Sequence, residues 1–97
     1  MVVFVCSPFG GKKENVQLAR DYCRNEMEIG NVPFAPHLLF PQFMSELTER
    51  GDAIHMGIEI LERCDELHVW GGKVTSGMRS EILAAESCGI PVVMMED

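Results

Sequence analysis

The chain has 97 residues and a formal net charge of −7, and this length predicts one compact domain spanning residues 1–97. The negative charge argues against nonspecific binding to nucleic acid or to an anionic membrane, so we expect neither as a partner. The sequence contains no apolar run of transmembrane length and does not open with a signal peptide, which favours a cytoplasmic protein.

The chain begins with a strand and a long helix. Residues 1–6 are continuously apolar and rich in β-branched side chains, as is typical of a central parallel strand buried on both faces. Pro8, Gly10 and Gly11 predict a flexible turn after this strand. Residues 13–29 then predict a helix. Its expected buried stripe comprises Val16, Ala19, Cys23 and Met27.

The middle of the chain predicts a short strand, an apolar loop and a second helix. Residues 32–35 form the strand, and Pro33 makes it an edge strand. The apolar residues 36–43 are interrupted by two prolines, so we expect a loop that covers a pocket or meets a partner. Residues 45–63 predict a helix, with a possible interruption near Gly51. Its expected buried stripe is Ile54, Ile58 and Leu61.

The last third predicts a strand at 65–70, a helix that ends at Gly89 and Pro91, and a strand at 92–95. Strands that alternate with amphipathic helices indicate an α/β fold, with a parallel sheet covered on both faces. Right-handed crossovers and short connections favour the strand order 2-1-3-4. We therefore expect a three-layer α/β/α, flavodoxin-like domain with a four-stranded parallel sheet.

Glu81 is the candidate functional residue of the last helix. Ser76 is the expected N-cap, and Glu81 lies more than a turn further along the helix, on the side shared with Gly77 and small residues. Ligands of such folds bind beyond the carboxyl ends of the strands, where the loops 6–12, 36–43 and 70–77 converge. This topology places Glu81 in the ligand crevice. A solvated surface glutamate is the alternative.

The cysteines and histidines do not form a recognisable metal or redox motif. The four cysteines are widely spaced within apolar patterns, which favours reduced cysteines in the core. The three histidines show neither HxxxH nor HExxH spacing. We expect neither a metal ion nor a cofactor.

With these residues in place, the whole chain resembles the nucleoside 2-deoxyribosyltransferase superfamily, which includes 2′-deoxynucleoside 5′-monophosphate N-glycosidases. Transferases of that family carry an acidic residue, Ser-Gly-Thr, two further residues and a nucleophilic glutamate, and Ser76, Gly77 and Glu81 match this pattern. The N-glycosidases carry a serine, two glycines and a basic residue after the first strand. The matching residues here are Ser7, Gly10, Gly11 and Lys12.

The resemblance implies that Glu81 attacks the anomeric carbon of a nucleoside or nucleotide, and that water or a second base resolves the glycosyl-enzyme. It implies a phosphate against Ser76 and Gly77, at the helix N-terminus. Met78, the next residue of the run, is a further ligand-binding candidate. Phe9 and Trp70 are candidates to stack on the base, with core packing as the alternative. His37 is a candidate donor to the base or phosphate, with a structural role as the alternative.

Two departures from the family pattern concern the acid that assists the leaving base. Family enzymes have an aspartate at the position of Gly57, and the transferase motif opens with an acidic residue where this chain has Thr75. Asp52, Glu59 and His55 are candidate substitutes. The exposed sheet edges and the apolar segment 36–43 also favour a homo-oligomer.

Three functions remain open at this point. The first is an N-glycosidase or deoxyribosyltransferase-like enzyme acting on a small nucleoside or nucleotide. The second is a protein of the same fold that binds or sequesters a nucleotide or a nucleotide-derived signal without cleaving it, a hypothesis motivated by Gly57. The third is a purely structural role.

Overall fold

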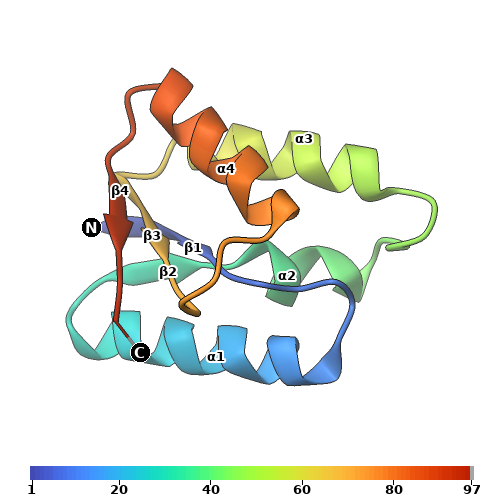
Figure 1. The fold of residues 1–97 in the computed structure, drawn as a ribbon, viewed down its shortest axis with the longest axis horizontal. Helices are drawn as coiled ribbons and strands as arrows, with labels where there is room; N and C mark the ends of the chain where they lie inside the picture. The colour runs from blue at the N-terminus through green and yellow to red at the C-terminus, as the bar shows by residue number, and fades with distance from the viewer. Residues whose placement is uncertain (97) are drawn as a thin grey trace.

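The computed structural model describes residues 1–96, and its centre is a parallel four-stranded sheet in the order β2-β1-β3-β4 (Figure 1). The strands are β1 (Val2–Cys6), β2 (Val32–Phe34), β3 (Glu66–Val69) and β4 (Val92–Met94). The helices are α1 (Lys13–Glu28), α2 (Pro36–Leu39), the 3-10 turn η1 (Phe40–Gln42), α3 (Arg50–Leu61) and α4 (Ser76–Ser87). The predicted fold class and strand order are confirmed.

Helix α1 covers one face of the sheet, and α3 and α4 cover the other (Figure 1). Alternation along β1 divides the core accordingly. Phe4 and Cys6 belong to the cluster beneath α3 and α4, whereas Val5 packs with Tyr22 of α1. Parallel pairing of Cys6 with Val69 brings the carboxyl ends of the two central strands together. Loops that leave these ends therefore meet at one edge of the sheet.

Segment 36–43 is not the loop that the sequence predicts. It forms the short helix α2 and the turn η1, and Phe40 is buried against Phe34 of β2 and Phe43. Pro36 and Pro41 occupy the first turns of these elements, where a proline lacks only an N–H that would be unpaired anyway. The prolines thus start helical turns instead of breaking them.

Helix α3 begins at Arg50, five residues later than predicted. The Ser45 hydroxyl accepts from the N–H groups of Leu47 and Thr48, and the Glu49 carboxylate accepts from the N–H of Ser45. Such local bonds from side chain to backbone compete with helix formation and hold this segment as a separate turn.

The buried stripe of α1 also differs from the prediction. Ala19, Tyr22 and Glu26 are buried, whereas Met27 is 49% exposed. Both stripes have helical spacing, and the true one contains a glutamate with no exposed surface. Glu26 is buried because polar groups of β3 and of the turn after α1 bind its carboxylate.

Several smaller expectations can be compared with residues 1–96. β2 lies at an edge of the sheet, as Pro33 predicts. All four cysteines are free, but Cys88 is exposed and so is not a core cysteine. No helix in this range is long and apolar enough to cross a bilayer.

Candidate active site

A cavity of about 340 Å³ lies beyond the carboxyl end of β1, between α2, α3 and the start of α4. The loop after β1 contributes Ser7, Phe9 and Gly10 to its lining, and α2 contributes His37. Helix α4 contributes the remaining predicted residues that reach the cavity, which are Ser76, Gly77, Met78 and Glu81. The structure thus brings together eight of the ten residues predicted to form a site.

Gly11 and Trp70 do not line the cavity. Gly11 lies in the exposed turn before α1, where its backbone φ of +73° suits glycine. Trp70 is buried on the opposite face of the sheet and stacks on Tyr22, with ring centroids 5.0 Å apart. The prediction that Trp70 stacks on a bound base is therefore replaced by the alternative of core packing.

The start of α4 is set by Thr75, one residue earlier than predicted. Thr75 has extended backbone angles, and its Oγ1 accepts from Met78 N at 3.3 Å, so Thr75 is the N-cap and Ser76 is the first helical residue. Since the cap uses the Thr75 hydroxyl, the Ser76 side chain is left for the cavity. The cap also places Glu81 in the second turn of the helix.

Glu81 presents a partly unsatisfied carboxyl group to the cavity. Its Oε1 is buried and has no hydrogen-bond partner among the described residues. Burial raises the pKa of Glu81 to about 7, and a hydrogen bond from Cys6 acts in the opposite direction. A carboxyl group near its midpoint at neutral pH, with a free buried oxygen, is suited to nucleophilic or acid–base chemistry.

The Cys6 side chain interacts with the carboxyl group of Glu81, a role that the sequence did not suggest. The residue has no exposed surface, and its Sγ lies 3.7 Å from the Met78 carbonyl oxygen. Burial, followed by the negative charge of Glu81, raises the thiol pKa well above its usual range, so the thiol stays protonated and can donate. The position of Cys6 at the carboxyl end of β1, on the face that α4 covers, could have indicated this role.

Ser7, Phe9 and His37 form the wall opposite α4. His37 Nε2 lies 2.8 Å from the Ser7 carbonyl oxygen and donates to it, and the His37 ring stacks on Phe9 at 4.5 Å and 13°. Burial is the main cause that lowers the pKa of His37, so the ring is neutral at pH 7. Ser7 Oγ is buried without a hydrogen-bond partner within residues 1–96, which leaves a polar atom free for a ligand.

Arg50 and Glu46 are lining residues that sequence reasoning missed. Arg50 Nη1 lies 3.4 Å from Glu46 Oε1, and a Cβ built on Gly77 would lie 3.8 Å from Arg50 Nη2. The guanidinium therefore reaches the N-terminus of α4. The sequence contains no motif that marks this pair, because both residues fall within the predicted helix 45–63.

Gly57 lies on the apolar side of the cavity, as part of α3. A Cβ at this position would only touch Phe40, at 3.8 Å, so the site has room for a side chain. Asp52, His55 and Glu59 do not line the cavity, which removes them as substitutes for an acid there.

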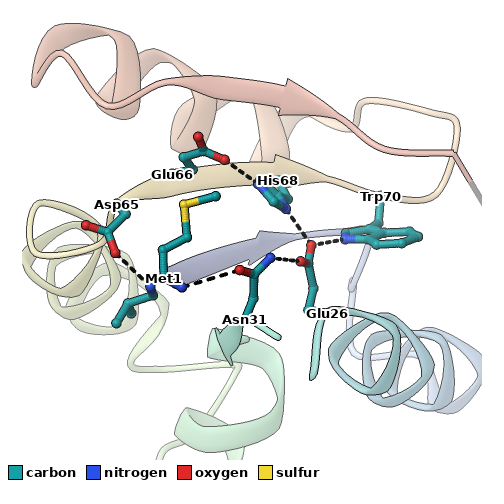
Figure 2. A network of polar contacts seen from close by, with 8 residues as sticks. Met1, Glu26, Asn31, Asp65, Glu66, His68 and Trp70 are labelled. Carbon is teal, nitrogen blue, oxygen red and sulfur yellow. Dashed lines mark hydrogen bonds and ion pairs between the residues drawn. The ribbon is translucent and has the colours of Figure 1, made fainter. Parts of the chain in front are cut away.

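A fully buried glutamate, Glu26, lies on the α1 face of the sheet (Figure 2). Glu26 Oε2 accepts from His68 Nδ1 at 2.6 Å and from Trp70 Nε1 at 3.0 Å, and its Oε1 accepts from Asn31 Nδ2 at 2.9 Å. The other His68 ring nitrogen lies 2.7 Å from Glu66 Oε1. Every oxygen of Glu26 is satisfied, which marks this cluster as structural.

Comparison with known proteins defines the family. A family model described as a domain of unknown function (DUF7768) matches residues 1–95. The chain belongs to this family. No curated protein matches the sequence.

The fold of this DUF7768 domain is similar to that of a solved 2-deoxyribosyltransferase from the psychrotolerant bacterium Bacillus psychrosaccharolyticus. The TM-score is 0.78 at 18% sequence identity, over 97% of this chain and 71% of the enzyme chain. At this identity the likeness establishes the shared fold, as the resemblance of the sequence motifs implies.

Proposed function

We propose that the protein binds a nucleotide and cleaves or transfers its N-glycosidic bond, with Glu81 as the nucleophile. The observation that carries this proposal is the Glu81 carboxyl group in the cavity, with a pKa of about 7 and one buried oxygen that no described residue pairs with. The structural likeness to a 2-deoxyribosyltransferase and the matching Ser-Gly-x-x-x-Glu spacing support the same chemistry.

The chemistry has two displacements. The ionised Glu81 attacks the anomeric carbon, the bond from that carbon to the base nitrogen breaks, and the base leaves with the bonding electrons. Water or a second base then attacks the same carbon, and Glu81 leaves as a carboxylate. Because both steps invert the anomeric carbon, the overall result is retention.

The polar end of the cavity suits a phosphate. Ser76 and Gly77 lie in the first turn of α4, where N–H groups have no intrahelical partner, and Arg50 reaches the same turn. A local site of this kind holds a dianion despite the net charge of −7. Phe9 and His37 offer a ring surface for the base, next to the unpaired hydroxyl of Ser7.

The test is release of free base from a panel of nucleotides and deoxynucleotides, followed by chromatography with and without a second base. We expect Glu81→Gln to lower the rate by about 10⁴-fold or more, because the amide cannot form the ester intermediate. Glu86→Gln is the matched control, since Glu86 is exposed on the same helix. A panel without any released base, or full activity in Glu81→Gln, contradicts the proposal.

The second candidate is a protein that binds a nucleotide without turning it over. It is favoured by Gly57 and Thr75, which leave no carboxyl group at two points of the lining. This function predicts that a nucleotide raises the melting temperature and is recovered intact. Recovery of free base excludes it.

We also propose that the protein forms a homo-oligomer through the segment beside the cavity mouth. Phe43 and Leu47 are 62% and 95% exposed, next to the lining residues Met44 and Glu46. Exposed apolar side chains of this size favour burial against another copy. Light scattering should give at least a dimer mass that Leu47→Lys reduces; a monomer mass for the unaltered protein contradicts this proposal.

A further inference from the structure

On the wall formed by Ser7, Phe9 and His37, the hydrogen bonds already made leave acceptor groups available to a ligand. His37 is neutral and its Nε2–H is committed to the Ser7 carbonyl oxygen, so its Nδ1 carries a lone pair and no proton. Glu46 contributes a carboxylate that pairs with Arg50. His37 Nδ1 and the Glu46 carboxylate therefore accept hydrogen bonds, the Ser7 hydroxyl can donate or accept one, and neither His37 nor Glu46 supplies a proton to a departing base.

Among residues 1–96, the charged residues of the lining are two carboxyl groups, Glu46 and Glu81, and two cations, Lys12 and Arg50. The Glu46 carboxylate is close enough to His37 to act on its titration, and the ionised Glu81 adds a second negative charge. Arg50 reaches Gly77 at the proposed phosphate end, and Lys12, an exposed residue before α1, also lines the cavity. The ring face of Phe9 also attracts positive charge.

We infer that the preferred substrates are nucleotides whose base is attached through a cationic ring nitrogen, such as a pyridinium or an N7-alkylated purinium. This inference rests on the proposed function. A neutral base leaves as an anion unless an acid protonates it, whereas a cationic base leaves as a neutral molecule. The acceptor-rich wall suits the cation in the bound state, and the reaction does not need the acid.

The step balances without a proton donor. Glu81 forms an ester bond to the anomeric carbon, and the carbon–nitrogen bond breaks with both electrons passing to the ring nitrogen, whose positive charge disappears. Water then cleaves the ester to give the sugar phosphate, the Glu81 carboxylate and one proton released to solvent. The sum is cationic nucleotide plus water giving neutral base, sugar phosphate and a proton.

Two matched substrate pairs test the inference. Nicotinamide mononucleotide is compared with its reduced form, which has a neutral dihydropyridine, and 7-methylguanosine 5′-monophosphate is compared with guanosine 5′-monophosphate. After subtraction of spontaneous hydrolysis, we expect the cationic member of each pair to react at least 100-fold faster in kcat/KM, since a general acid contributes about 10²–10⁴-fold where one is present.

The outcomes separate the two proposals. Cleavage of both members of a pair at comparable rates, abolished in Glu81→Gln, overturns the cationic preference and leaves the glycosidase proposal standing. Cleavage of neither member, together with no base from the wider panel, overturns both. Glu46→Gln adds a further readout, because loss of its negative charge should raise KM for the cationic member and not for the neutral one; equal changes in KM count against the inference.

Discussion

A fully buried glutamate, Glu26, and a half-buried one, Glu81, lie on opposite faces of the same sheet, and their surroundings differ in one respect. Both carboxylate oxygens of Glu26 accept hydrogen bonds, from His68, Trp70 and Asn31, in a polar network between α1 and the sheet (Figure 2). Glu81 has a buried oxygen that finds no partner within residues 1–96, and its carboxyl group faces a cavity. A buried charge is tolerated in a fold when it is paired, so the paired glutamate stabilises and the unpaired one is available for chemistry.

The strongest test of the structural half of this comparison is Glu26→Ala. The substitution leaves the buried donors of His68 and Trp70 without their acceptor, and we expect the free energy of unfolding to fall by about 3–5 kcal/mol. Urea unfolding measures it. Glu28→Ala is the control on the same helix, because Glu28 is exposed and forms a surface ion pair with Arg24. A loss under 1 kcal/mol for Glu26→Ala would show that the cluster is not structural.

The pH dependence of stability tests the cost of burying Glu81. Its pKa is raised from 4.5 to about 7, so between these pH values the native state binds more protons than the unfolded state. The free energy of unfolding should therefore fall by roughly 3 kcal/mol as pH rises from 4.5 through 7, and stay low above it. Comparison of the unaltered protein with Glu81→Gln at pH 5 and pH 8 isolates this contribution. A pH-independent difference contradicts the burial argument.

Trp70→Phe separates the two faces of the sheet. Loss of the indole donor to Glu26 should lower the free energy of unfolding by about 1.5–3 kcal/mol, because the bond goes to a charged group. The rate of base release per folded molecule should not change, since Trp70 does not line the cavity. Calorimetry and the base-release assay on the same preparation give both values. A lower rate of base release per folded molecule would show that Trp70 acts in the site.

Cys6→Ala is the smallest expected effect and sharpens the account of Glu81. The thiol hydrogen bond lowers the pKa of Glu81, so its removal should move the acid limb of the kcat/KM profile to higher pH by about half a unit to one unit. Cys6→Ser, which keeps a donor, should restore the limb or move it to lower pH. An unchanged profile in both variants would mean that Cys6 only fills space.

The sequence was sufficient for the fold because the strand-forming runs, such as residues 1–6, are strongly apolar and right-handed crossovers limit the topology. It was insufficient for Glu26, whose burial depends on His68 and Trp70, 42 and 44 residues away along the chain. The spacing and family motif predicted Glu81. Arg50 was not predicted as a site residue, because α3 starts later than predicted. This late start depends on the side-chain bonds of Ser45 and Glu49.

The central claim is that Glu81 forms a covalent glycosyl intermediate, and the stereochemistry of the product tests it most directly. Base release in the presence of methanol, monitored by proton NMR, gives a methyl glycoside whose anomeric configuration is fixed when it forms. Two displacements through Glu81 predict retention of the nucleotide's configuration. Inversion would show a single direct displacement and would contradict the role of Glu81 as nucleophile.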